Sequence, residues 1–137
     1  MMKENEMRAL ALAVIKKDNK ILVTPGHDDI KNEDFYRLPG GGIDFGETSQ
    51  QALEREMQEE FGAKITNLKL VKVIENLFTY NKWAGHEICF VYTADFIDQD
   101  LYKKEALPIL DIEGGYASIW VDIDKLNRLY PEGSLNY

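Results

Sequence analysis

The stretch from residue 41 to residue 63, GGIDFGETSQQALEREMQEEFGA, carries the clearest structural information in this chain of 137 residues. Thr48 and Gln51 have the spacing of a helix N-cap and its capping-box partner. Gly62 suits the left-handed position that follows the last turn of a helix. No glycine or proline interrupts the residues between them. The stretch therefore predicts an α-helix over residues 49–61.

One edge of this predicted helix is acidic. At about 100° per residue, Glu56, Glu59 and Glu60 lie together beside the apolar stripe. Like charges at this spacing cost roughly 0.2–0.5 kcal/mol per pair unless a cation lies between them. Oxygen ligands without His or Cys favour Mg²⁺, with Mn²⁺ as a substitute. The glycines at 40–42 would expose backbone groups nearby, which favours a metal and phosphate site over an ordinary solvated helix face.

The remaining pattern predicts an α+β domain in which strands outnumber helices. Apolar and β-branched runs predict strands over residues 8–16, 21–24, 35–38, 64–80, 86–96 and 118–121. Residues 25–34 and 97–116 are interpreted as loops, and the turn between the two long strands is expected to exceed two residues. Residues 122–130 are expected to form a helix of about two turns, which Pro131 ends.

Composition restricts the class of protein. The chain has the size of one domain over residues 1–137, and its net charge of −8 disfavours a non-specific nucleic-acid binder. A single cysteine, Cys89, cannot form an internal disulfide. Apolar runs fall well short of the roughly 20 residues of a membrane span. We therefore expect a cytoplasmic protein without membrane segments.

The quoted stretch resembles the signature of the Nudix hydrolases, G-x5-E-x7-R-E-U-x-E-E-x-G-U, in which U is a bulky apolar residue. The matching positions are Gly41, Glu47, Arg55, Glu56, Met57, Glu59, Glu60 and Gly62. Only Ala63 departs, because it is smaller than the usual apolar residue. The resemblance implies a MutT-like Nudix α/β/α sandwich with a central mixed sheet. It also implies magnesium-dependent hydrolysis of the pyrophosphate linkage in a nucleoside diphosphate joined to another group.

The same resemblance implies roles for individual residues. The implied metal ligands are the carboxylates of Glu56, Glu59 and Glu60 and the backbone carbonyl of Gly40. Arg55 would act at the catalytic centre by holding a glutamate in place, and Glu47 would brace the loop against the helix. As the catalytic base, Glu56 and Glu59 rank ahead of the loop residues Glu105 and Glu113.

Four residues are candidates for contact with the substrate. Tyr80 lies 17 residues beyond the signature, where dinucleoside polyphosphate hydrolases of the family tend to carry a tyrosine that stacks on a base. Gly41 lies within the glycine segment and Arg37 shortly before it, so both are expected near phosphate. Glu87 begins a strand from which it could reach a pocket. Each also has a structural reading, as a hairpin aromatic, a backbone position or a solvated strand residue.

Two functions from different classes follow. The first is an enzyme acting on a nucleoside triphosphate, a dinucleoside polyphosphate, ADP-ribose or a nucleotide sugar. The second is a non-catalytic nucleotide-sensing module, which the intact charged set disfavours. RNA decapping is weakened by the acidic charge. The expected partner is a small nucleotide rather than a nucleic acid, and a homodimer is the default assembly.

Overall fold

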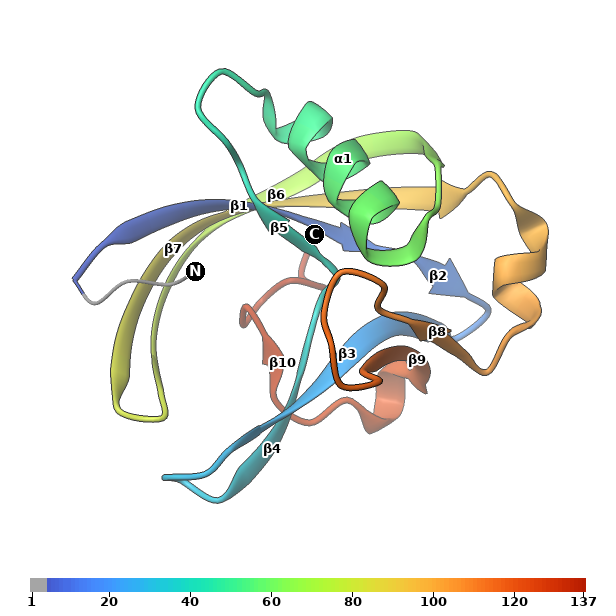
Figure 1. The fold of residues 1–137 in the computed structure, drawn as a ribbon. Helices are drawn as coiled ribbons and strands as arrows, with labels where there is room; N and C mark the ends of the chain where they lie inside the picture. The colour runs from blue at the N-terminus through green and yellow to red at the C-terminus, as the bar shows by residue number, and fades with distance from the viewer. Residues whose placement is uncertain (1–4) are drawn as a thin grey trace.

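A computed structural model describes residues 5–137 as two β-sheets and an α-helix (Figure 1). The helix, α1, spans Ser49–Phe61. The first sheet contains, in spatial order, β5 (Gly40–Gly42), β1 (Met7–Val14), β7 (Trp83–Phe96) and β6 (Ile65–Tyr80). Because β1 and β7 run parallel while the other pairs are antiparallel, this sheet is mixed.

The second sheet is built mainly from antiparallel pairs. Its strands are, in spatial order, β10 (Leu129–Tyr130), β4 (Glu33–Arg37), β3 (Lys20–Asp28), β9 (Ala117–Asp122) and β8 (Ala106–Pro108), with β2 (Lys16–Lys17) paired to β3. Two short 3₁₀ helices, η1 (Gln99–Lys103) and η2 (Ile123–Lys125), lie in the connections. Figure 1 shows α1 on one side of the first sheet and the second sheet on the other.

The first sheet is therefore covered on both faces. On one face, α1 buries Leu53 and Met57 against Ala11 and Ala13 of β1. On the other, Leu12 packs with residues of β3 and β7 in a second apolar cluster. Each fully buried Leu or Met side chain contributes roughly 1.5–3 kcal/mol to folding. Burial on both faces explains why β1 is an unbroken apolar run rather than an alternating one.

The predicted helix and its ends are confirmed. The side chain of Thr48 accepts from the backbone N–H of Gln51, and the side chain of Gln51 accepts from the N–H of Thr48. Gly62 adopts a left-handed conformation with φ of 63°, and its N–H donates to the carbonyl of Gln58. The α+β class with a mixed central sheet is confirmed as well.

The predicted loop over residues 25–34 is wrong. β3 continues to Asp28 and β4 begins at Glu33, so only a short turn separates them. Pro25 is tolerated in β3 because β9 pairs with that strand only as far as Val23. Beyond Val23 the strand has one neighbour, and the N–H that proline lacks is not required on the open side.

The predicted helix over residues 122–130 is also wrong. After the single turn of η2, Arg128 adopts a left-handed φ of 53°, which ends any helical path. The next two residues form β10, which lies parallel to β4, and the N–H of Tyr36 donates to the carbonyl of Arg128 at 3.0 Å. Pairing with a distant strand thus outweighs the local pattern.

The turn between the two long strands is shorter than predicted. β6 ends at Tyr80 and β7 begins at Trp83, so Asn81 and Lys82 alone form the turn. Both have positive φ, 46° and 73°, as in the two-residue turns that match the twist of a hairpin. Within residues 5–137, α1 and the short 3₁₀ turns all lack the length and apolar character that a membrane-crossing helix needs.

Candidate active site

Arg55 organises the acidic residues of α1. Its Nε and Nη2 donate to the two carboxylate oxygens of Glu47 at 2.8 and 2.9 Å. Its Nη1 donates to Glu56 at 3.0 Å and to Glu59 at 3.2 Å. Nη2 also donates to the carbonyl of Gly42 at 3.0 Å. One guanidinium therefore fixes the helix to the preceding loop and orients two of its carboxylates.

The pKa values of Glu47 and Glu56 are shifted in opposite directions. Donation from Arg55 and from the backbone N–H of Asp44 lowers the pKa of Glu47 from 4.5 to about 2. The pKa of Arg55 is raised by its bonds to Glu47, Glu56 and Glu59. Burial raises the pKa of Glu56 in spite of its bond to Arg55. Glu47 is thus a brace that stays ionised well below neutral pH, whereas Glu56 is held where its charge is less favourable.

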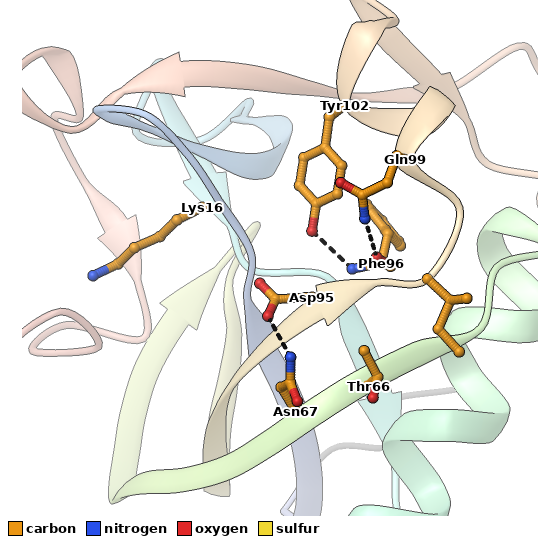
Figure 2. Close-up of a pocket in the computed structure, with 8 residues that line it drawn as sticks. Lys16, Thr66, Asn67, Asp95, Phe96, Gln99 and Tyr102 are labelled. Atoms are coloured by element: carbon orange, nitrogen blue, oxygen red, sulfur yellow. Dashed lines mark hydrogen bonds between the residues drawn. The ribbon is translucent and has the colours of Figure 1, made fainter.

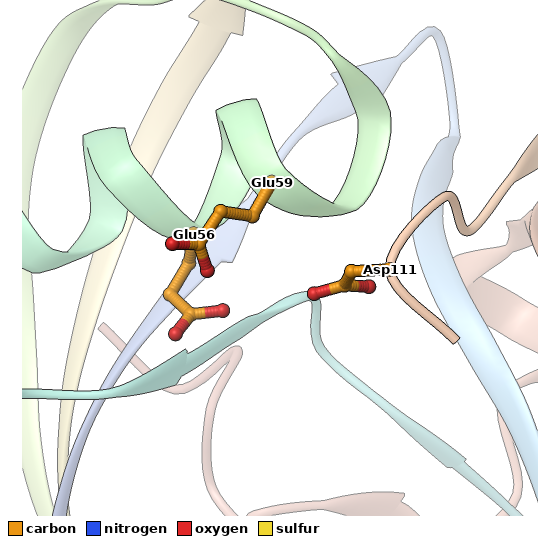
Figure 3. A group of neighbouring side chains, drawn as sticks. All are labelled: Glu56, Glu59 and Asp111. Atoms are coloured by element: carbon orange, nitrogen blue, oxygen red, sulfur yellow. The ribbon is translucent and has the colours of Figure 1, made fainter.

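A loop supplies a further acid to this cluster. One carboxylate oxygen each from Glu56, Glu59 and Asp111 lie within 4.8 Å of one another, and Figure 3 shows the loop bringing Asp111 beneath the helix. The loop is held there because the N–H of Leu110 donates to the backbone carbonyl of Glu60 at 2.7 Å.

Asp111 is not among the site residues predicted from the sequence. The loop acids that it named, Glu105 and Glu113, are not members of the group formed by Glu56, Glu59 and Asp111 in the described chain. Only the acidic character of residues 97–116 could have indicated a loop ligand, and that character does not say which acid reaches the helix.

Glu60 lies at the junction between this cluster and a cleft. Burial, followed by the charges of Glu56 and Asp111, raises its pKa to about 8, although Arg37 and the N–H of Gly40 act in the opposite direction. The free carboxyl therefore retains its proton at neutral pH. Glu56 and Glu60, whose pKa values are raised, therefore lie close to the carboxylates of Glu59 and Asp111. A bound cation would stabilise the ionised form of these groups.

The donor set fits a hard divalent cation. Glu56, Glu59 and Asp111 offer only oxygen ligands, and Glu60 stands at their edge. Carboxylate oxygens suit Mg²⁺, Mn²⁺ or Ca²⁺ rather than metals that prefer nitrogen or sulfur. The structure thus contains an acidic group that could bind such an ion.

Two glycines allow the chain to pass close to the helix. A Cβ at Gly41 would lie 2.6 Å from Oε2 of Glu56, and a Cβ at Gly40 would collide with the carbonyl oxygen of Ala11. Gly40 also has a φ of 136°, which residues with side chains rarely adopt. Both positions therefore require glycine for space, and Gly40 requires it for conformation too.

A cleft of about 660 Å³ extends from this point between the two sheets. The four residues that the sequence analysis selected for substrate contact, Gly41, Arg37, Tyr80 and Glu87, all line it, together with Glu60. The structure therefore brings the predicted contact residues to one cavity with the acidic cluster at its edge. A volume of this order lies within the usual range for small-molecule sites.

The far end of the cleft is closed by two hairpin tips. Oδ1 of Asp28, in the β3–β4 hairpin, accepts from the N–H of Ile30, and Oδ2 accepts from the N–H of Asn81 in the β6–β7 hairpin at 3.1 Å. Lys31 Nζ adds a bond of 2.7 Å to the carbonyl of Thr79. These contacts hold the two walls at a fixed separation.

A second hollow, of about 670 Å³, has a different character (Figure 2). Its polar groups bond to each other: Asn67 donates to Asp95 at 3.0 Å, and the N–H of Phe96 donates to the hydroxyl of Tyr102 at 2.8 Å. Gln99 donates to the carbonyl of Phe96. Most of its polar groups are therefore used within the protein, and the three carboxylates grouped at α1 lie outside it.

A helix of clustered acids lies beside a glycine strand at the edge of a cleft between two sheets, and its acidic group could hold a metal ion. The NUDIX domain family model matches residues 5–135. The chain belongs to this family.

Individual relatives differ in what they are named for. The chain is 38% identical over 71 residues to an RNA pyrophosphohydrolase of Pelagibacter ubique, covering 52% of the chain and 42% of the relative. It is 36% identical over 95 residues to an ADP-ribose pyrophosphatase of Methanocaldococcus jannaschii, covering 64% and 50%. The chain therefore spans about half the length of these curated relatives or less.

Solved structures support the fold. A MutT NUDIX hydrolase from Burkholderia pseudomallei superposes with a TM-score of 0.66 at 24% identity, covering 90% of this chain and 89% of that one. At this identity the likeness establishes the fold alone.

Proposed function

We propose that this protein is a magnesium-dependent hydrolase that cleaves the pyrophosphate linkage of a nucleotide. The observation that carries the proposal is the meeting of Glu56, Glu59 and Asp111 at the edge of a cleft into which Glu60 and Arg37 also reach. The names of the relatives, a pyrophosphohydrolase and a pyrophosphatase, support the same reaction class.

Electrostatics explains why a cation belongs to this proposal. A diphosphate is anionic and the chain carries a net charge of −8, with several carboxylates at the proposed reaction centre. Direct contact between phosphate and these carboxylates would be repulsive. A bound Mg²⁺ would neutralise charge on the phosphate oxygens and activate water for attack on phosphorus.

The residues of the chain have distinct roles in this scheme. Arg55 positions Glu56 and Glu59, and Glu47 keeps Arg55 in place. Glu56, Glu59, Glu60 and the Gly40 carbonyl are the proposed ligands, to which the structure adds Asp111. Glu56 and Glu59 remain the first candidates for the base that takes the proton from water, because both are held by Arg55 next to the cleft edge.

The substrate classes proposed are nucleoside triphosphates, dinucleoside polyphosphates, ADP-ribose and nucleotide sugars. A relative named RNA pyrophosphohydrolase makes RNA a necessary comparison, although the acidic charge favours a small nucleotide. A reaction on free nucleotides would take place in the cytoplasm, where these compounds are made.

A panel of these compounds, incubated with purified protein and Mg²⁺, tests the proposal when the products are separated by chromatography. Release of a nucleoside monophosphate from at least one compound is expected, and Glu59→Gln is expected to abolish that release. If no compound is cleaved but one raises the melting temperature, the alternative proposal, a nucleotide-sensing module without turnover, replaces the first.

We also propose a homodimer. Met7, Val73 and Leu77 project from the helix side of the first sheet beyond the area that α1 covers, and they are 61%, 51% and 70% exposed. Exposed apolar side chains on one face of a sheet are typical of an interaction surface, and exposed Glu75 lies between Val73 and Leu77 on this one. Light scattering should give the mass of two chains, and Leu77→Asp should give the mass of one. A wild-type protein that scatters as a single chain would rule the dimer out.

A further inference from the structure

Three polar side chains lie next to one another on the floor of the cleft. Arg8 of β1 is paired with Glu87 of β7, and Glu87 is paired in turn with Asn76 of β6. Residues directly opposite each other on neighbouring strands project from the same face of a sheet. All three line the cleft. Arg8, Glu87 and Asn76 therefore form a cross-strand row that faces any ligand in this cavity.

Glu87 carries a buried carboxylate with an unused acceptor. Its side chain is 9% exposed, and Arg8 Nε and Nη2 both donate to the same oxygen, Oε2, at 3.2 and 2.6 Å. For the other oxygen, Oε1, residues 5–137 provide no hydrogen-bond donor. Within residues 5–137, Oε1 is not one of the fully buried atoms that lack a partner, so it is accessible from the cleft that Glu87 lines. A ligand that presents an N–H to Oε1 would take the place of water there.

The character of the row excludes phosphate as its ligand. The charge of Arg8 is already matched by the carboxylate of Glu87, and the free Oε1 would repel an anion. A neutral group with an N–H donor beside an acceptor fits the row, because Arg8 and Asn76 supply further donors next to Oε1. The edge of a nucleobase has this combination.

The row also lies at a suitable distance from the acidic cluster. β1 pairs with Gly40 at Leu12, and Arg8 precedes Leu12 by four residues. β1 also pairs with Gly42 at Leu10, so at about 3.3 Å per residue the row is roughly 7 Å along the strand from Gly42 and roughly 13 Å from Gly40. A nucleotide whose diphosphate lay at Gly40 and Gly41 could therefore extend its base to the row.

Aromatic rings stand beside the row. Phe35 of β4 and Tyr80 of β6 meet edge to face with their ring centroids 5.6 Å apart, and both line the cleft with Phe78. Aromatic faces stack on any nucleobase, so they add affinity without selecting the base. Stacking on the walls and hydrogen bonding at the floor would act on the same planar group.

We propose that the cross-strand row is a nucleobase-binding subsite in which Glu87 Oε1 accepts an N–H from the edge of the base. The subsite makes the substrate a nucleotide rather than a diphosphate that lacks a base. This inference rests on the proposed function only for the placement of the diphosphate, since binding of the base requires no turnover.

Calorimetry on the full chain in Mg²⁺ tests the proposal with five compounds: AMP, GMP, CMP, UMP and ribose 5-phosphate. The last is the base-free control, and none contains a pyrophosphate linkage. At least one nucleotide should bind about tenfold or more tightly than ribose 5-phosphate, as a charge-assisted hydrogen bond together with stacking predicts. Equal affinities for all five would overturn the proposal.

Substitutions then test whether the preference for a nucleotide over ribose 5-phosphate depends on the cross-strand row. In Glu87→Gln the amide oxygen would accept from Arg8 and the amide N–H₂ would face the cleft. The N–H of the base would then meet another hydrogen-bond donor instead of an acceptor. This variant should lose the tenfold advantage while its affinity for ribose 5-phosphate is unchanged. Asn76→Ala, which keeps the Arg8–Glu87 pair, should reduce the advantage as well. The matched control is Glu75→Gln, one residue along β6 on the opposite, exposed face, which should behave as the wild type.

The outcomes separate the two proposals. An unchanged nucleotide preference in both Glu87→Gln and Asn76→Ala would overturn the subsite, as would an equal loss of affinity for ribose 5-phosphate. If the preference depends on Glu87 but no compound of the hydrolysis panel is cleaved, the subsite stands and the proposed hydrolysis fails.

Discussion

Addition of one methyl group at Gly41 should disable the site without unfolding the protein. A Cβ at this position would lie 2.6 Å from Oε2 of Glu56, whereas ordinary van der Waals contact begins at 3.4 Å. Because Cδ of the same carboxylate would lie nearer still, the carboxylate must retreat by more than about 0.8 Å. Displacement of a catalytic group by about 1 Å costs about 10²-fold in rate. We predict that Gly41→Ala lowers kcat/KM about 100-fold on whichever nucleotide the wild type cleaves.

Gly42→Ala is the matched control for this experiment. It places the same methyl group on the next residue of β5, where no atom lies within 4 Å of the added Cβ. Activity of Gly42→Ala should stay within about threefold of the wild type. Both variants should melt close to the wild-type temperature, because the added methyl meets no atom at residue 42 and at residue 41 meets the far end of the flexible Glu56 side chain. Equal activities for the two variants would refute the argument that Glu56 must approach the backbone of β5.

Three further predictions follow from single residues. The pKa of Glu47 is lowered from 4.5 to about 2, so its contribution to stability is present above pH 4.5 and is lost as the pH falls toward 2; thermal melts should therefore decline less steeply across this range for Glu47→Gln than for the wild type. Burial raises the pKa of Cys89 to about 12, so iodoacetamide at pH 8 should label the thiol only after denaturation, and rapid labelling of the folded protein would contradict its burial. Asp111→Asn should weaken Mg²⁺ binding about tenfold or more in a calorimetric titration, whereas Glu113→Gln should not; equal affinities would remove Asp111 from the site.

The sequence was sufficient where structure depends on neighbouring residues. The cap formed by Thr48 and Gln51, the end at Gly62 and the acidic edge of α1 all involve residues within a few turns of one another. Each could be derived from spacing on a helix. The resemblance to a known signature added the fold, which does not follow from local spacing.

The sequence was insufficient where the structure depends on contacts between segments that are distant in the chain. Residues 129–130 pair with β4, nearly a hundred residues earlier, and no local pattern records that partner. Asp111 reaches the helix because Leu110 bonds to the backbone of Glu60, a contact that fixes one acid of an acidic loop and leaves Glu105 and Glu113 outside the cluster. The neutralised pair of Arg8 and Glu87 likewise depends on strand register across the first sheet.

The proposed hydrolysis requires that the acidic edge of α1 binds a divalent cation. The most direct measurement is a titration of wild type and Glu59→Gln with Mg²⁺ in the calorimeter, followed by turnover of the best nucleotide with the same two proteins. We predict saturable binding that Glu59→Gln weakens about tenfold or more, together with a fall in turnover of about 100-fold or more at an unchanged melting temperature. Wild-type protein that takes up no Mg²⁺, or a Glu59→Gln variant that retains full turnover, would contradict the account.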